Sequence, residues 1–268
     1  MLEILIVNYI VAALSGLLVG SISIPLTTSR SVTFGLTLLH SILGGSLLGV
    51  YLSALYDLPI PVPLVSTLTA ITLSIIVGEL MERGFSEDMS IAFSVSIATT
   101  MTIIFGYLSS LVSSIAFAKA WAYIAGTSTI SSIEDILRLL LGLSIVVPTT
   151  HLLFKEFKYI AFDPDGAEAM GLNIRFYRYV FYSLTAISSS ILSSTIGVLA
   201  THVILAIPGI IYMRLFRRLN ISASYLLGVM IMVAGYLLAS LMAIPPSGGV
   251  GLTSIIAVLG VTVYGRRT

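Results

Sequence analysis

The chain has 268 residues, of which 57% are hydrophobic and only 9% are charged, and its mean hydropathy is +1.07. Soluble domains carry roughly 25% charged residues, so 13 basic and 12 acidic side chains are too few to cover a water-soluble globule of this length. The formal net charge of +1 excludes a strongly basic nucleic-acid-binding protein, and the lack of cysteine excludes disulfide frameworks and thiolate metal sites.

Apolar segments of membrane-spanning length follow one another along the chain, so we expect an all-α polytopic membrane protein with about nine transmembrane helices, roughly eight to ten. We place these helices at residues 4–24, 33–55, 62–80, 90–112, 134–154, 176–196, 198–213, 222–243 and 251–264. The predicted helices at 176–196 and 198–213 abut so closely that the turn near Gly197 would lie within the membrane. Residues 113–133 are less apolar and form either an interfacial segment or an extra short helix.

Lysine and arginine side chains predict the orientation, because cytoplasmic loops carry an excess of them. With the N-terminus outside and the C-terminus cytoplasmic, 11 of the 13 basic residues are cytoplasmic. These are Arg30, Arg83, Lys155, Lys158, Arg175, Arg178, Arg214, Arg217, Arg218, Arg266 and Arg267. Only Lys119 and Arg138 would lie on the outer side of the membrane. Residues 1–24 contain no basic residue, so we expect a retained first helix rather than a signal peptide.

Residues 155–178 are the one cytoplasmic segment long enough to hold structure of its own. The sequence predicts a short helix there, between Asp163 and Asn173. Asp163 suits the N-cap, Pro164 suits the first helical position, and Gly171 suits the left-handed residue that follows a helix.

Charges and an apolar pair support the same helix. Asp165 and Glu168 favour the positive end of its dipole, and Phe162 would pack onto Ala167 as a hydrophobic staple. A helix of about seven residues is too short to be stable alone in water. It must therefore pack either against the end of its own bundle or against a cytoplasmic partner, in which case we expect Ala167 on the docking face.

This segment resembles the coupling segment of ABC-transporter permeases of the zinc, manganese and iron type. The likeness lies in Phe162-Asp163-Pro164 and in Glu168-Ala169-Met170-Gly171-Leu172. Three further blocks resemble the same family in chain order. They are Leu38–Gly45 with His40 in register, Ile196–Leu199 continuing to Pro208, and Pro246–Gly248. Together the four blocks cover residues 30–264.

The resemblance implies a single permease domain over residues 1–268, in the plasma membrane, with a coupling segment at 155–178. It implies three protein partners, namely an ABC ATPase subunit that holds the ATP, a second permease copy and an extracytoplasmic substrate-binding protein. Membrane lipid surrounds the chain, and neither a nucleic-acid partner nor a cofactor of its own is expected. The residues that would contact the ATPase are Phe162, Asp163, Pro164, Ala167, Glu168, Met170, Gly171 and Leu172.

Three positions depart from the family pattern. Leu39 replaces the usual Ser before the His, Gly44 replaces a Pro, and Ile244 stands where many members have an Asp. The resemblance implies a divalent transition metal ion as substrate. Loss of the acid leaves a metal chelate, such as haem, a siderophore or cobalamin, as the alternative.

Few side chains within the predicted spans are able to meet a metal ion. His40 lies about seven residues, or roughly 10 Å, inside its span, and intramembrane ionisable residues tend to mark transport pathways. His40 and His202 are the candidate metal ligands, although each would also serve as a packing or hydrogen-bonding group between helices. Asp57 begins an outer loop, where it would attract cations, dock the binding protein or simply be solvated. Glu79, near the cytoplasmic end of its span, is expected to reach the lipid headgroups.

Three functions compete. The sequence contains no G-x-x-x-x-G-K-[ST] phosphate loop, so a chain powered by ATP needs an ATPase on another chain. A secondary transporter would carry several charged residues at mid-membrane, and this chain has almost none. An intramembrane enzyme is disfavoured, because neither H-E-x-x-H nor G-x-S-x-G occurs.

Overall fold

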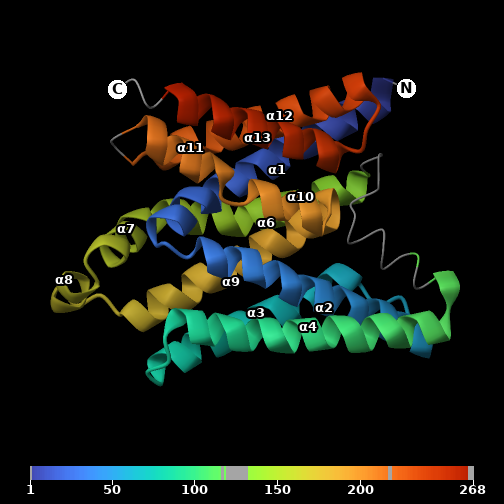
Figure 1. Ribbon diagram of the computed structural model, residues 1–268, viewed down its shortest axis with the longest axis horizontal. Helices are drawn as coiled ribbons and strands as arrows, with labels where there is room; N and C mark the ends of the chain where they lie inside the picture. Colours follow the sequence, from blue (N-terminus) through green and yellow to red (C-terminus); the bar gives the residue numbers. More distant parts are fainter. Residues whose placement is uncertain (1, 116–117, 119–131, 217–218, 265–268) are drawn as a thin grey trace.

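The computed structural model describes residues 2–115, 118, 132–216 and 219–264, arranged as Figure 1 shows. The main elements of this part of the chain are all helices, which confirms the predicted all-α class. They are α1 (Leu2–Thr28), α2 (Val32–Tyr56), α3 (Val62–Glu82), α4 (Glu87–Val112), α6 (Ile133–Leu152), α7 (Phe154–Phe162), α8 (Pro164–Ala169), α9 (Ile174–Ile196), α10 (Val198–Ile204), α11 (Ile207–Leu215), α12 (Ile221–Met242) and α13 (Pro246–Tyr264).

Within the described ranges, 7 helical stretches are long and apolar enough to cross a membrane, or up to 8 if the bent pair α6 and α7 is one span. The chain is therefore a polytopic membrane protein. Every predicted span coincides with a helix, except that residues 198–213 are divided between α10 and α11. The serine-rich helix α9 is not among the stretches that meet both criteria, so a count of nine crossings stays a prediction, as does the orientation. Most of the ambiguous stretch 113–133 lies outside the described residues.

The helices stack in layers (Figure 1). Helices α11, α12 and α13 form one side, α2, α3 and α4 form the other, and α6, α9 and α10 lie between them. Helix α1 packs chiefly against α12 and α6, α2 packs against α4 and α3, and α3 packs against α9. The short helix α8 projects at one end of the bundle, so the layers place the predicted coupling segment apart from the membrane-spanning core.

Glycines set the closest approaches between helices. A Cβ atom at Gly16 would lie 2.5 Å from the Cα atom of Val229 in α12, and one at Gly45 would lie 2.7 Å from the side chain of Thr69 in α3. Lipid is as apolar as the helix surfaces, so close backbone packing rather than the hydrophobic effect drives helix association in a membrane. Each of these glycines belongs to a small-xxx-small pattern, Gly16-xxx-Gly20 in α1 and Gly45-xxx-Gly49 in α2, and both patterns serve helix packing.

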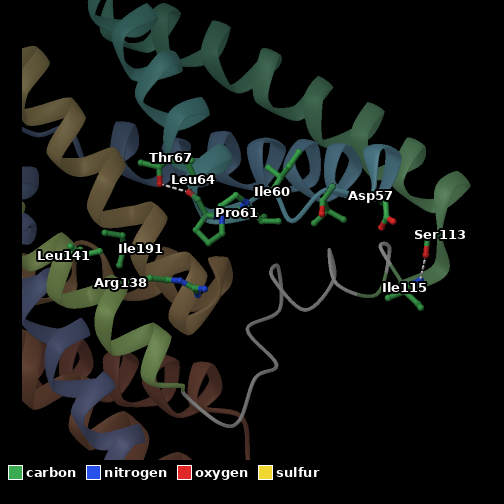
Figure 2. A pocket seen from close by; sticks show the side chains of 15 residues that line it. Asp57, Ile60, Pro61, Leu64, Thr67, Ser113, Ile115, Arg138, Leu141 and Ile191 are labelled. Carbon is green, nitrogen blue, oxygen red and sulfur yellow. Dashed lines mark hydrogen bonds between the residues drawn. The ribbon is translucent and has the colours of Figure 1, made fainter.

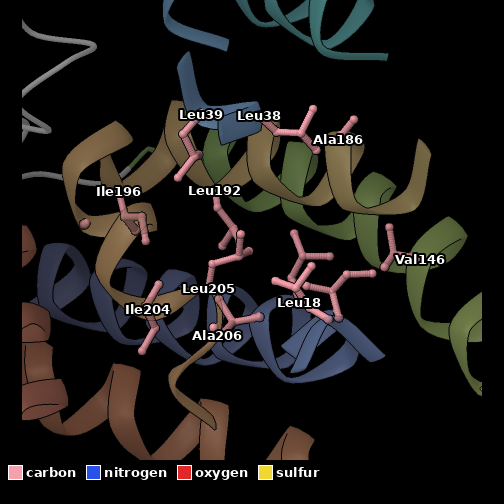
Figure 3. Close-up of a cluster of buried hydrophobic side chains, with 14 of the residues drawn as sticks. Leu18, Leu38, Leu39, Val146, Ala186, Leu192, Ile196, Ile204, Leu205 and Ala206 are labelled. Carbon is pink, nitrogen blue, oxygen red and sulfur yellow. The ribbon is translucent and has the colours of Figure 1, made fainter. Parts of the chain in front are cut away.

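Buried leucines fill the space between the layers (Figure 3). Leu39 of α2, Leu192 of α9 and Leu205, which follows α10, are each 0% exposed. Leu39 stands where the family usually has a Ser, and its burial shows that this departure from the pattern adds to the packed core.

The segment after α6 differs from the prediction. The span predicted at 134–154 ends as α6 at Leu152, and Phe154–Phe162 form a further helix, α7, which is bent by 58° from α6. Phe157 is buried on one face, whereas Lys155 and Tyr159 are exposed on the other. The lysines mask the apolar periodicity of this short amphipathic helix, which is why the sequence pattern did not reveal it.

Candidate functional site

The structure brings the two candidate metal ligands together. The ring of His40 in α2 meets the ring of His202 in α10, with 5.7 Å between centroids and 83° between planes. His40 is exposed and His202 is half-buried. Among the described residues, no hydrogen bond joins the His40 ring to another group, so the interhelical hydrogen bond considered for it is absent there.

A backbone contact fixes the tautomer of His202. Its Nδ1 atom lies 3.1 Å from the carbonyl oxygen of Val198, one turn earlier in the same helix. A carbonyl only accepts hydrogen bonds, so Nδ1 donates and Nε2 carries the lone pair of the neutral ring. The contact lies within α10 and does not join two helices. It leaves Nε2 as the nitrogen that a metal ion would meet.

Two chain breaks bound the short helix that carries His202. Gly197 separates α9 from α10 with a φ of 88°, a conformation that glycine adopts without strain. Leu205 and Ala206 then separate α10 from α11, where Pro208 lies in the first turn. The result is a seven-residue helix inside the stretch predicted as one span, and Gly197 lies at the break between α9 and α10.

The histidine pair has no acidic third member in the described ranges, where no three His, Asp or Glu side chains lie close enough to share a metal ion. Ile244, at the position of the family's acid, lies in the turn between α12 and α13. A stable tetrahedral zinc site needs three or four protein ligands. One chain therefore supplies half of such a set.

Asp57 lies apart from the histidines. It caps the end of α2 in a left-handed conformation, with a φ of 51°, and its side chain is exposed. It lines a cavity of about 850 Å³ whose other lining residues include Ser53, Thr67 and Arg138, and neither histidine is among them (Figure 2). The structure thus divides the three predicted pathway residues into a pair and a single acid.

The predicted short helix is confirmed as α8, with both of its caps. The Asp163 Oδ1 atom accepts a hydrogen bond of 3.0 Å from the Gly166 amide. At the other end, the Gly171 amide donates to Glu168 O at 2.8 Å and the Leu172 amide donates to Ala167 O at 3.0 Å. This pair of bonds is the Schellman motif, and Gly171 has the expected positive φ of 84°.

The exposure of individual side chains corrects one part of that prediction. Ala167 is 0% exposed, so it faces the bundle and does not lie on an accessible docking face. Phe162 and Met170 are 66% and 64% exposed, so Phe162 is not buried by a staple onto Ala167. The burial of Ala167 holds this short helix, while Phe162 at the end of α7 and Met170 just after α8 are two large apolar side chains that stay uncovered. Asn173, predicted as the end of this helix, instead caps α9 by accepting from the Phe176 amide.

An ion-pair cluster beside α8 was missed by the sequence reasoning. Glu79 pairs with Arg175 and Arg83, and Glu82 pairs with Arg178. Glu79 therefore binds neighbouring side chains, and its reach to the lipid headgroups stays a prediction. Arg175 and Arg178 lie far from the two acids in the chain, and only the packing of α3 against α9 brings them together.

Comparison with known proteins adds three findings. The model of a family described as the ABC 3 transport family matches residues 1–265. A membrane protein of Cyanophora paradoxa, encoded in the ycf23-apcF intergenic region, is 30% identical over 126 residues, which are 46% of this chain and 42% of that protein. The chain thus matches less than half the length of this relative.

Two solved structures share the fold. The first, PsaBC from Streptococcus pneumoniae in complex with Fab, has a TM-score of 0.76 at 16% identity, over 95% of this chain and 89% of the other. The second is an inward-facing conformation of a protein assigned to the metal-chelate type of ABC transporter. It has a TM-score of 0.65 at 18% identity, over 95% of this chain and 86% of the other.

Proposed function

Because the chain belongs to the ABC 3 transport family, we propose that it is the membrane-spanning permease subunit of an ATP-binding-cassette importer for divalent transition metal ions, with zinc, manganese and iron as candidates. It is a multi-pass protein of the plasma membrane. The observation that carries the choice of substrate is the His40–His202 pair, in which two imidazole side chains from separate helices meet at the surface of the single chain.

Imidazole is a suitable ligand for this class of ion. Neutral imidazole binds zinc, iron and related metals through the nitrogen that carries no proton, and the Val198 carbonyl leaves His202 Nε2 in that state. Two nitrogens hold an ion weakly compared with a complete set of three or four ligands. Weak binding suits a permease, because its cargo must leave the site as readily as it enters.

A second copy of the chain would complete the ligand set. His40 is exposed on the single chain although it lies within a membrane-spanning helix, and an ionisable side chain facing lipid is costly. A symmetric dimer that covers this face would remove that cost, because a two-fold interface brings the same patch of both copies together. Four imidazoles would then surround one axial pathway.

The proposed topology has nine spans, with the N-terminus outside and α8 in the cytoplasm. Figure 1 supports it, since the ends of α3, α7 and α11 lie at the same end of the bundle as α8. These ends carry Arg83, Lys158 and Arg214, whereas Arg138 lies in the first turns of α6 at the opposite end. Such an imbalance is the expected mark of the cytoplasmic side.

Each end of the helix bundle offers a surface to which we assign one protein partner. The exposed Phe162 and Met170 beside α8 are the surface we assign to a separate ATPase subunit, which would hold the ATP. At the other end, the cavity lined by Asp57 and Arg138 is where we expect an extracytoplasmic substrate-binding protein to deliver its cargo. Docking at both ends links ATP hydrolysis on one side to delivery on the other.

A metal chelate is the second candidate substrate. Ile244 supplies no oxygen ligand, the described residues give each chain only two imidazoles, and the outer cavity of about 850 Å³ is much larger than a single ion. One of the structures with this fold is assigned to the metal-chelate type. On this account the histidines would be packing groups, and their loss would leave chelate uptake intact.

Growth rescue distinguishes the two substrates. The complete transporter would be expressed in strains that each lack one importer for zinc, manganese, iron or a chelate. We expect rescue in a free-metal strain, its loss with His40→Ala or His202→Ala, and retention with His151→Ala, an exposed histidine in the last turn of α6. Rescue only of chelate uptake, unaffected by the first two substitutions, would overturn the free-metal proposal.

A further inference from the structure

Helices α3 and α9 are joined by polar contacts just beyond α8. Arg175 Nη2 donates to Glu79 Oε2 at 2.9 Å, and the Tyr179 hydroxyl donates to the same oxygen at 3.2 Å. Arg178 donates to Glu82 Oε1. We call these five residues the α3–α9 clamp. Arg175 and Arg178 lie near the start of α9, a few residues after α8 ends. Among the contacts described here, the clamp is the attachment to α3 that lies nearest to α8 along the chain.

Close packing supports the polar contacts. The Tyr179 ring lies against α3 at Gly78, where an added Cβ atom would be 2.6 Å from the Tyr179 Cε1 atom. The Arg175 guanidinium lies over the same ring, 5.5 Å from its centroid. The side chains of Arg178 and Glu82 are only 26% and 31% exposed. Tyr179 and the Arg178–Glu82 pair are therefore packed between the two helices, whereas the side chains of Arg175 and Glu79 are more exposed, at 55% and 38%.

The same two helices are joined again at their far ends. The Ser190 hydroxyl of α9 lies 3.0 Å from the Ser66 hydroxyl and 2.7 Å from the Thr67 hydroxyl of α3. Ser66 and Ser190 are buried, so these bonds are shielded from competing water. Contacts at both ends oppose sliding or tilting of α9 on α3, so we expect the two helices to move as one unit.

Helix α3 is in turn packed tightly against α2, the helix that carries His40. A Cβ atom at Gly45 would lie 2.7 Å from Thr69, and one at Gly49 would lie 3.2 Å from the Val65 side chain. An uninterrupted series of close contacts therefore runs from α8 through α9, α3 and α2 to His40.

The placement of the clamp charges is unfavourable for each helix alone. Glu79 and Glu82 lie in the last turn of α3, and Arg175 lies in the first turn of α9. The helix dipole favours the opposite arrangement, with basic groups at the C-terminus and acidic groups at the N-terminus. Local helix stability thus does not explain these charges, whereas the contact between the helices does.

We propose that Glu79 and Glu82, with Arg175 and Arg178, are positioning residues that transmit movement of α8 to α3 and, through α2, to His40. The proposal rests on the permease function given above and adds the route by which an ATPase at α8 would act on the histidine pair. The clamp stays closed throughout the cycle, since it acts as a rigid connection.

Charge exchange tests this route. The complete complex with its ATPase is reconstituted in proteoliposomes, and metal uptake per ATP hydrolysed is measured with Zn²⁺ or Mn²⁺ as the probe. Arg178→Glu or Glu82→Arg alone places like charges together and should lower this ratio by at least about fivefold, the low end of typical couplings between sites. The double exchange E82R with R178E restores an ion pair, now in the orientation that both helix dipoles favour, and should restore the ratio.

Arg83→Gln is the matched control, because Arg83 pairs with Glu79 within α3 and does not reach α9. It should leave the ratio unchanged. Single variants that assemble normally and transport like the wild type would overturn the clamp proposal, and so would a double exchange that fails to restore uptake. If the wild-type complex itself hydrolyses ATP without moving metal, the permease proposal fails instead, so the two failures are distinguishable.

Discussion

The imidazole rings of His40 and His202 meet edge to face, with 5.7 Å between their centroids, although they belong to helices from opposite halves of the chain. The contact depends on the short helix α10, which begins after Gly197 and ends before Ala206. The packing of α10 against α2 therefore brings a second imidazole to His40.

The tautomer of His202 predicts which substitution it tolerates. A glutamine amide reaches roughly the position of the imidazole Nε2 atom, whereas an asparagine amide reaches that of Nδ1, which is already occupied by the Val198 carbonyl. We expect His202→Gln to keep part of the metal uptake and His202→Asn to lose it. The loss should be at least the roughly 10–100-fold seen when outer-shell partners of metal ligands are disturbed. Equal uptake by the two variants would show that Nε2 is not the ligand.

Gly171 should be required for its backbone conformation alone. Its φ is 84°, and no atom lies within 4 Å of a Cβ atom added there, so valine would meet no steric clash. The left-handed conformation costs an L-residue about 1–2 kcal/mol, which should unwind the Schellman motif that closes α8. We expect Gly171→Val to lower coupled transport and Gly171→Asn, which tolerates this conformation, to lower it less. Unchanged transport in the valine variant would show that the cap of α8 is not needed for coupling.

The exposed apolar side chains beside α8 should bind the ATPase. Replacing Phe162 or Met170 with Ser removes apolar area from a surface that is 66% or 64% exposed on the free permease. We expect weaker co-purification of the ATPase, with a loss of about 1–3 kcal/mol for each side chain if it is buried in the complex. Phe85→Ser is the control, because Phe85 is similarly exposed, at 52%, in the turn between α3 and α4. A complex weakened only by the control would place the docking surface on that turn.

Orientation can be tested with single cysteines, since the native chain has none. Glu168 is exposed in α8, and Glu134 is exposed in the first turn of α6 at the opposite end. With the N-terminus outside, a membrane-impermeant thiol reagent added to intact cells should label Glu134→Cys and not Glu168→Cys. Permeabilised cells provide the control, in which both should be labelled. Labelling of Glu168→Cys in intact cells would reverse the topology.

Local signals in the sequence were sufficient for much of the fold. The caps of α8 follow from Asp163, Pro164 and Gly171, whose preferences are set by their own backbone and near neighbours. The membrane-spanning helices follow from the length of the apolar segments, because a bilayer demands that length. The match of His40 to the histidine of the family's sequence pattern likewise required only the residues around it, Leu38–Gly45.

Long-range packing explains what the sequence did not reveal. Nothing local connects Glu82 with Arg178, since the ion pair exists only once α3 lies against α9. Ala167 was assigned to the docking face because its position in the motif says nothing of which side of α8 meets the bundle. The break before α11, by contrast, has a local signal in Pro208, because a proline inside a helix removes a backbone hydrogen bond; the prediction of one span over residues 198–213 did not use it.

ATP-driven metal accumulation in proteoliposomes is the most direct test of the account. Permease and ATPase would be reconstituted together, with Zn²⁺, Mn²⁺ or Fe²⁺ supplied on the side of the binding protein, and uptake compared between the wild type and the H40A and H202A double variant. We predict uptake by the wild type that requires ATP hydrolysis, and its loss in the double variant at unchanged ATPase assembly. Normal metal uptake by the double variant would contradict the assignment of the histidine pair to the transport pathway.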